Sequence, residues 1–326
     1  MSRMSVLSDA QWARIESLMP SSDGQRGRPF RDHRQVVEAI IYRYRCGIAW
    51  RDLPEGFGPW QTVWKRHRRF SADGTWDRIH ARLLAEADAE GGIDWSVSVD
   101  STINRAHQHA TNLPRATTVD VEVAASPGGN TGAEPNDKNR GGRGTKPLKP
   151  VAPLLADGLR LEPSDHAIGR SRGGLSTKIH QLVDGTGLPL VVIVGAGQSG
   201  DSPVFAHLLA GLSVPRVGPG RPRSRPVAVL GDKAYSSRAN RAMLRRRGIR
   251  AVIAEPSDQA GHRRRRGSAG GRPPAFDTDA YKGRNVVERS FNNVKQWRGL
   301  ATRYDKLAIV YRGAAVLRAI VLWLRQ

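Results

Sequence analysis

The sequence is short of cysteine, of acidic residues and of long apolar runs. Its single cysteine, Cys46, excludes a disulfide framework and a zinc site built from thiolates. The apolar run 188–194 is too short to cross a membrane, and the stretch 307–324 is interrupted by Arg312 and Arg318. The N-terminus has no apolar signal-peptide core. We therefore expect a soluble, cytoplasmic protein with no membrane partner.

Acidic residues are outnumbered by basic ones, 30 against 52, so the 326-residue chain carries a formal net charge of +22. A field of this size repels itself unless a polyanion is nearby, and each phosphate contact releases a counterion. The composition therefore favours a nucleic-acid partner over the weaker alternative, an anionic membrane surface. The hydrophobic content of 39% is enough for one large or two smaller cored domains.

The first hundred residues have a helical pattern. Ser8, followed three residues later by Gln11, is typical of a capping box and begins a helix that Pro20 ends. Further helices are expected at 32–45, from residue 60 to about 70, and at 76–88. Six of the eight tryptophans precede residue 96, which predicts a compact helical domain with an aromatic core of its own.

The third of these helices has a buried stripe and a basic face. The expected stripe comprises Trp60, Val63, Trp64, His67 and Phe70. The rest of its surface is strongly cationic, with Lys65, Arg66, Arg68 and Arg69. One interpretation is a helix-turn-helix-like module whose third helix enters a DNA groove. The other is an ordinary amphipathic helix with a solvated basic face; the overall charge favours DNA binding.

Two aspartates are expected where strands end. Residues 95–100 alternate with period two, so Asp100 ends a strand on its small, polar face. Asp232 follows the short apolar strand 227–230, at the carboxyl end where α/β sheets bind ligands. Either residue could instead be a simple turn or cap residue. The nearby pair His107 and His109 lacks a third nitrogen or sulfur ligand, so zinc is disfavoured.

A helix over 281–298 would align one carboxylate with two cations and a phenol. By helical period, four residues share a sector of roughly 60°: Tyr281, Arg284, Glu288 and Lys295. Apolar side chains take most of the opposite side. The face is either a solvated ion-pair surface, or a metal-binding carboxylate flanked by cations that hold a phosphate backbone.

The remaining pattern predicts a mixed α/β sheet flanked by helices. A hairpin is expected at 176–194, and a further strand at 249–253. Residues 110–169 have poor periodicity and predict a flexible insertion, and 255–280 predicts a flexible basic loop. Two strand-borne aspartates and a helix-borne glutamate can meet at one sheet edge. Three hard oxygen donors suit two Mg²⁺ or Mn²⁺ ions and phosphodiester cleavage or transfer.

At these residues the chain resembles the DDE transposases of bacterial insertion sequences, in the insertion-sequence-five family. The signature Tyr-x2-Arg-x3-Glu-x6-Lys is complete, from Tyr281 to Lys295. Further similar motifs are VDST at 99–102, RAH at 105–107, RGGLSTKIH at 172–180, GDKAY at 231–235, KQWRG at 295–299 and WRDLP at 50–54. The resemblance covers nearly the whole chain apart from the insertion.

The resemblance implies a ribonuclease-H-like core in which Asp100, Asp232 and Glu288 coordinate two divalent ions, Mg²⁺ or Mn²⁺. Water, and then a DNA 3′-hydroxyl, would attack phosphodiesters without a covalent protein–DNA intermediate. Three signature residues would contact double-stranded DNA at the element ends: Tyr281, Arg284 and Lys295. The protein would act on the nucleoid, as a homodimer or a larger synaptic complex on element-end and target DNA.

The expected organisation is a helical DNA-binding domain at 1–92 and a catalytic domain at 93–326. The helical domain would help to recognise the terminal inverted repeats. The same residues are compatible with two alternatives to a transposase. One is a metal-dependent nuclease that cleaves without joining strands, and the other is a catalytically inactive or diverged copy that acts as a DNA-binding repressor.

Overall fold

The computed structural model describes residues 6–21, 30, 32–113, 162, 163 and 165–326. Most of the insertion expected at 110–169 therefore lies outside the described residues. The short 3-10 helix η3 (Gln108–Thr111) overlaps its first two residues, and strand β2 (Gly169–Ser171) begins at its last residue. Among the described helices, none is long and apolar enough to span a bilayer.

The N-terminal region is helical, as expected. Helix α1 (Asp9–Glu16) begins at the capping box of Ser8, and α2 (His33–Cys46) ends at Gly47, whose φ is +68°. Helices α3 (Trp60–Ala72) and α4 (Thr75–Ala89) follow. The connection from α2 to α3 contains two 3-10 turns, η1 (Trp50–Asp52) and η2 (Glu55–Phe57). It is longer than the short turn of a helix-turn-helix pair.

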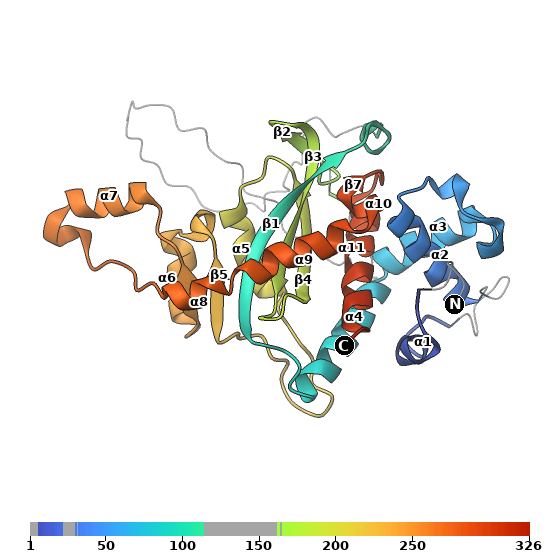
Figure 1. Cartoon of the computed structure of the whole chain (residues 1–326), viewed down its shortest axis with the longest axis horizontal. Helices are drawn as coiled ribbons and strands as arrows, with labels where there is room; N and C mark the ends of the chain where they lie inside the picture. Colours follow the sequence, from blue (N-terminus) through green and yellow to red (C-terminus); the bar gives the residue numbers. More distant parts are fainter. Residues whose placement is uncertain (1–5, 22–29, 31, 114–161, 164) are drawn as a thin grey trace, which may run out of the picture.

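The sheet has the mixed topology of a ribonuclease-H-like core (Figure 1). Strand β1 (Ser96–Ala106) is antiparallel to β3 (Gly174–Val183), which is antiparallel to β4 (Pro189–Ala196). On its other side, β1 is parallel to β5 (Ala228–Gly231), and β5 is parallel to β6 (Arg250–Ile253). Strand β2 pairs with the start of β3, and β7 (Thr302–Arg303) pairs with the end of β1.

Helices cover both faces of this sheet. Neighbouring residues of a strand point to opposite faces. Asp100 bonds to Arg284, at the start of α9 (Asn285–Lys295), whereas Ser101 bonds to Asp201, at the start of α5 (Asp201–Gly211). Helices α9 and α5 therefore lie on opposite faces. Helix α6 (Arg238–Arg246) packs beside α5 and β6.

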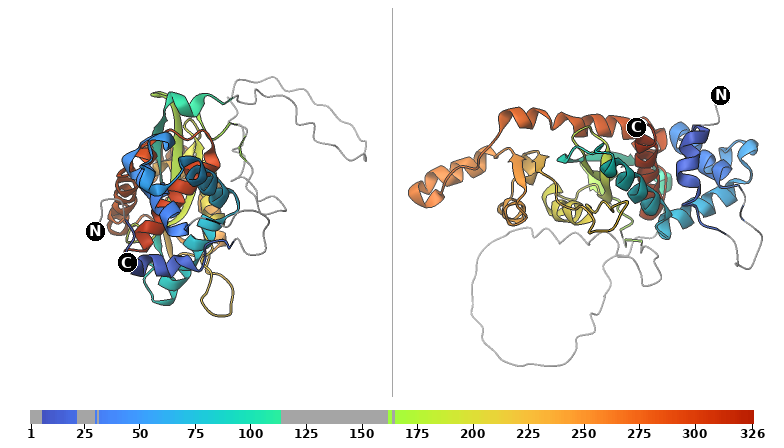
Figure 2. Two further views of the ribbon diagram at one scale, coloured as in Figure 1. Left: turned by 90° about the vertical axis from the view of Figure 1, so that its right-hand side faces the viewer. Right: turned by 90° about the horizontal axis from the view of Figure 1, so that it is seen from below.

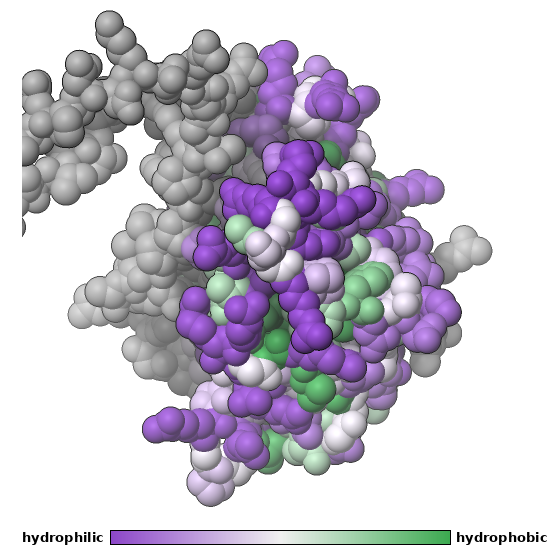
Figure 3. Space-filling model, turned by 90° about the vertical axis from the view of Figure 1, so that its left-hand side faces the viewer, coloured by the Kyte–Doolittle hydropathy of each residue, from purple (hydrophilic) through white to green (hydrophobic). Residues whose placement is uncertain are grey.

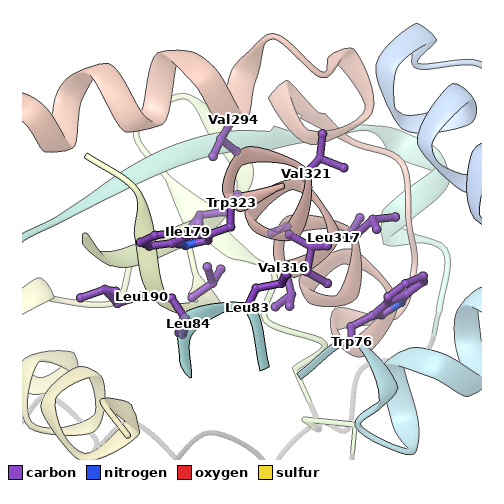
Figure 4. Packing of buried hydrophobic residues seen from close by; sticks show 14 of the residues in the cluster. Trp76, Leu83, Leu84, Ile179, Leu190, Val294, Val316, Leu317, Val321 and Trp323 are labelled. Carbon is purple, nitrogen blue, oxygen red and sulfur yellow. The ribbon is translucent and has the colours of Figure 1, made fainter. Parts of the chain in front are cut away.

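The C-terminal helix α11 (Ala308–Trp323) joins the N-terminal helices to the sheet. It packs against α3, α4 and β4, and nearly every residue along it is buried. In Figure 4, Leu83 of α4 lies beside Val316 of α11, and Leu84 lies on the side of Leu190 of β4. The N-terminal helices do not have a separate aromatic core, because their buried side chains belong to one cluster continuous with the sheet.

A buried polar group strengthens this junction. Asp305 accepts hydrogen bonds from the Arg43 guanidinium at 3.1 Å and from the Tyr44 hydroxyl at 3.0 Å. His67 is fully buried, as expected for a packed histidine, and accepts the indole N–H of Trp76 at 3.2 Å. Because a buried charge without its partner is strongly destabilising, these bonds favour one arrangement of the helices on the core.

Three local expectations were wrong. Strand β1 continues past Asp100 to Ala106, because β3 pairs with it as far as Arg105. The helix expected at 281–298 is interrupted near Gly283, giving α8 (Thr278–Lys282), α9 and then α10 (Arg298–Ala301). The loop expected at 255–280 contains helix α7 (Ser257–Arg265) and the 3-10 helix η5 (Gly267–Gly270), followed by most of α8.

Candidate active site

Asp100, on β1, and Asp232, the residue directly after β5, are neighbours where these two parallel strands stop pairing. The last paired residues of β1 and β5 are Val99 and Gly231, and each aspartate is the next residue along the chain. On that side of β1, the edge from residue 100 to residue 104 has no strand partner in the described structure until β7 pairs at residue 105. Both carboxylates are therefore placed where the parallel pairing ends, at an opening in the edge of β1.

The environment of Asp100 works against its negative charge. Desolvation by burial raises the pKa of Asp100, and the nearby charge of Asp232 also raises it. The backbone N–H of Ser101 and the guanidinium of Arg284 oppose this shift but do not cancel it. Their hydrogen bonds to the two carboxylate oxygens are both 2.8 Å long. A further positive charge close to Asp100 would therefore stabilise its ionised form.

Arg284 bridges Asp100 to Glu288. Its Nη1 donates to Asp100 Oδ2 at 2.8 Å, and its Nη2 donates to Glu288 Oε1 at 2.6 Å. The side chain of Arg284 is 17% exposed and that of Asp100 21%, whereas Glu288 is 55% exposed. All three residues thus gather at one place, although Arg284 faces the carboxylates in this structure and not open solvent.

Helix α9 is held against the sheet by its apolar side. Val286, Val287 and Phe291 pack on Val183 at the end of β3. Ser290 adds a buried hydrogen bond to Gln181, at 3.2 Å. This packing turns Glu288 toward the sheet edge that carries Asp100. The separation into an apolar and a charged side was predicted by the helical period.

Asp232 begins the short 3-10 helix η4 (Lys233–Tyr235). One carboxylate oxygen accepts the backbone N–H of Ala234 at 2.9 Å, so the side chain also serves as a helix cap. Tyr235 is fully buried, with its ring centroid 5.7 Å from that of Phe205. Burial, together with the charges of Asp201, Asp100 and Asp232, raises the pKa of its hydroxyl. The hydroxyl has no hydrogen-bond partner among the described residues.

The donor set fits a hard divalent cation, although the three carboxylates do not form a closed cage. In the part of the chain that the structure describes, no group of three or more His, Cys, Asp or Glu side chains is arranged to enclose a metal ion. Asp100 and Asp232 are the neighbouring pair, and Arg284 stands between Asp100 and Glu288. Carboxylate oxygens in this setting match the preferences of Mg²⁺ and Mn²⁺.

The other two signature residues flank this centre. Tyr281, on α8, is half-buried, and its ring centroid lies 5.1 Å from that of Phe276. The guanidinium of Arg284 lies 5.9 Å from the centre of the Tyr281 ring. Lys295 is exposed in the last turn of α9, two turns beyond Glu288 and on the same side.

The basic residues of α3 differ in exposure. Lys65, Arg68 and Arg69 are exposed. Arg66 is buried: its guanidinium lies 3.7 Å from the centre of the Phe30 ring and contacts His33 Nδ1 at 2.8 Å, and burial lowers its pKa to about 10. Arg66 is therefore a packed, buried side chain, and only the other three cations of α3 are exposed to solvent.

Sequence reasoning missed a polar network on the opposite face of β1. Asp201 accepts hydrogen bonds from Lys178 Nζ at 2.8 Å and from Ser101 Oγ at 2.7 Å. His180 lies beside them, fully buried, and burial lowers its pKa to about 4. The signal was present, because strand 174–183 contains several polar residues in a row at buried positions. This network supports the strand segment that carries Asp100.

Two protein families match long segments of the chain. Residues 91–324 match the family described as "Transposase DDE domain", and residues 7–80 match the family described as "Putative transposase of IS4/5 family". No solved structure is significantly similar to the chain.

Several curated proteins are similar to parts of the chain. An uncharacterized protein of Sinorhizobium fredii is 41% identical over 111 residues, covering 34% of this chain and 84% of the relative. A Brucella ovis protein named "Putative transposase for insertion sequence element IS6501" is 31% identical over 151 residues, covering 46% of this chain and all of the relative. A Burkholderia cepacia protein named "Putative transposase for insertion sequence element IS402" is 31% identical over 142 residues, 44% of this chain and 59% of that protein. The DDE-domain match covers most of the sequence, and Asp100 and Asp232 are neighbours at the sheet edge. The chain belongs to the transposase DDE domain family of insertion sequences.

Proposed function

We propose that the protein binds the terminal inverted repeats of its element and catalyses metal-dependent phosphodiester hydrolysis followed by DNA strand transfer. The observation that supports this most directly is the adjacency of Asp100 and Asp232, with Glu288 brought to the same edge by α9 and Arg284. The work would be done in the cytoplasm, on the nucleoid, by a homodimer or a larger synaptic complex, because two ends must be held together.

Asp100, Asp232 and Glu288 would hold two divalent ions, Mg²⁺ or Mn²⁺. Such ions, when bound, activate the attacking oxygen and stabilise the leaving one. The chain itself contributes the positions of these carboxylates and the cations around them. Arg284 is placed to neutralise charge at the centre, while Lys295 and the phenol of Tyr281 flank the route that a phosphate backbone would take.

The basic face of α3 would contribute to binding the repeats. Lys65, Arg68 and Arg69 are exposed, with Arg69 in a surface ion pair with Asp73, whereas Arg66 is packed against Phe30. Replacing the three exposed cations by glutamine should lessen the slope of log K against log salt by about 2.7, at roughly 0.9 per phosphate contact. An unchanged slope in a protein with unchanged thermal stability would count against this face as a DNA contact.

The central experiment incubates purified protein with labelled DNA ends of its own element in Mg²⁺ or Mn²⁺. We expect cleaved and joined products from the wild type and neither from Asp232→Asn. Asp279→Asn is the matched control, because Asp279 carries the same charge near the site but is exposed in a surface pair with Lys282. Unchanged activity of Asp232→Asn would refute the metal assignment.

The same assay separates the alternatives. Cleavage without joining would indicate a nuclease, and repeat binding without either reaction would indicate a repressor. Short inverted repeats on both sides of the gene, bordered by a small duplicated target, would support mobilisation by this protein.

A further inference from the structure

Helix α7 projects from the catalytic core without taking part in it. After β6 the chain leaves the sheet, forms α7 (Ser257–Arg265) and η5 (Gly267–Gly270), and returns to α8 near the active site. Figures 1 and 2 show α7 at one extremity of the described structure, beyond α6 and α8. It has no buried residue. A helix of nine residues that buries nothing gains little from packing, so its sequence is free to serve a surface role.

The far end of α7 concentrates positive charge. Four arginines are consecutive at 263–266, and the first, Arg263, is paired with Glu255. The next three are exposed and have no ion pair with an acid among the described residues: Arg264, Arg265 and Arg266. Figure 3 looks onto this end of the molecule, where hydrophilic residues cover most of the nearest surface. Neighbouring like charges repel, and a polyanion would offset that repulsion.

The composition of α7 favours a phosphate backbone over a lipid surface. Ala260 is the only apolar side chain in the helix sequence SDQAGHRRR. Membrane-surface helices need a row of large apolar side chains opposite the basic ones, and α7 lacks that row. Exposed arginines without apolar neighbours are suited to the phosphates of a nucleic acid.

Hydrogen bonds fix the near end of α7 to the turn that carries Asp232. Gln259 Nε2 donates to the backbone carbonyl of Ser236 at 2.7 Å, and Ser236 Oγ lies 3.3 Å from Gln259 Oε1. Ser236 is buried and directly follows η4, which Asp232 caps. Arg241, from α6, also donates to Ser236 Oγ at 2.9 Å. The position of α7 is thereby set relative to the catalytic turn.

We propose that α7 is an electrostatic arm that holds the phosphate backbone of duplex DNA beside the scissile bond, with Gln259 as the positioning residue that fixes the arm to the Asp232 turn. This inference rests on the proposed function, because it assigns part of the same DNA substrate to a second surface. A nine-residue helix is about 13 Å long, which corresponds to roughly four base pairs of duplex. The arm therefore acts on DNA a few base pairs from the reacting phosphodiester.

The test compares two triple variants that remove the same charge. The arm variant carries Arg264→Gln, Arg265→Gln and Arg266→Gln. The control variant changes three exposed arginines in the loop before β5, at the opposite end of the parallel strands: Arg216→Gln, Arg221→Gln and Arg225→Gln. Binding to end DNA is measured by fluorescence anisotropy across a salt series, with thermal stability measured for each protein.

We expect the arm variant to lessen the salt slope by about 2.7 and to weaken binding at low salt at least tenfold, with the control variant close to wild type. Equal effects of the two variants would overturn the arm and leave only general charge. Binding to vesicles of anionic and zwitterionic phospholipid is measured for the same proteins. If the arm variant keeps its DNA binding but loses vesicle binding, the assignment of α7 to DNA is overturned. If the wild-type protein cleaves and joins end DNA, failure of the arm prediction leaves the proposed function intact. If the wild-type protein does neither, the proposed function fails independently of the arm.

Discussion

Removing Arg284 should reveal two ion pairs of very different strength made by one side chain. Arg284 donates to Asp100 at 2.8 Å and to Glu288 at 2.6 Å, so distance alone would rank the Glu288 pair first. Exposure ranks them the other way. Asp100 is 21% exposed and Glu288 is 55% exposed, and water screens the second pair far more.

Double-mutant cycles measure each pair separately. We expect a coupling free energy of about 1–2 kcal/mol between Arg284→Gln and Asp100→Asn, typical of a charged hydrogen bond shielded from water. The coupling between Arg284→Gln and Glu288→Gln should be only about 0.3–0.5 kcal/mol. The single variant Asp100→Asn would understate the bond, because burial raises the pKa of Asp100 and removing its charge also removes a desolvation cost.

The assay is urea unfolding at pH 8, without DNA and with a chelator present, followed by fluorescence and circular dichroism to establish two-state behaviour. Asp279 and Lys282 form the control pair: their atoms are 2.8 Å apart, but the side chains are 90% and 79% exposed, so their coupling should be close to zero. A coupling with Glu288 as large as that with Asp100 would refute the argument that exposure decides the strength of these pairs.

Three further predictions concern stability and the arm. Burial lowers the pKa of three histidines from 6.5 to about 4 (His67, His80 and His180), so the unfolded chain binds more protons between these values. Each histidine should then lower the free energy of unfolding by roughly 1.4 kcal/mol per pH unit as the pH falls from 6.5 toward 4. Urea midpoints that do not change from pH 7 to pH 5 would contradict this prediction. Gly47→Ala should cost about 2 kcal/mol or more in urea unfolding, because φ is +68° and the new Cβ would lie 2.7 Å from Arg298 Cβ. Gly91→Ala, at φ +73° with nothing within 4 Å, should cost only about 1 kcal/mol, and equal losses would rule out the contact as the cause. Gln259→Ala should leave DNA affinity within about twofold but slow single-turnover cleavage roughly tenfold, since the arginines remain and only their placement changes; parallel losses of affinity and rate would disprove a positioning role.

Local patterns predicted the elements that depend on local interactions. The capping box at Ser8 and the helical pattern over 32–45 correctly indicated helices, because both signals act within a few residues. The alternation before Asp100 correctly indicated a strand. The end of that strand could not be found in the same way, because pairing with β3 extends it to Ala106, and β3 lies far along the chain.

In the candidate site too, local contacts could be predicted from the sequence and long-range contacts could not. The spacing of Arg284 and Glu288 predicts their contact, since residues four apart meet on a helix. Nothing in that spacing predicts the second contact of Arg284, with Asp100, because the fold alone brings these residues together. Arg66 shows the reverse case: its neighbours in sequence suggested a solvated basic face, and Phe30 and His33 from another segment cover it.

The position of α11 has a consequence for the order in which the chain can fold. Helix α11 supplies much of the apolar surface that α3 and α4 cover, so α3 and α4 leave the ribosome long before the helix on which they pack. At 5–20 residues per second, synthesis from the end of α4 at Ala89 to the start of α11 at Ala308 takes roughly 10–45 s. During that interval the N-terminal helices lack their packing partner. A nascent chain should therefore gain stably packed α3 and α4 only after α11 has been made, by which time every strand of the described sheet has also been synthesised.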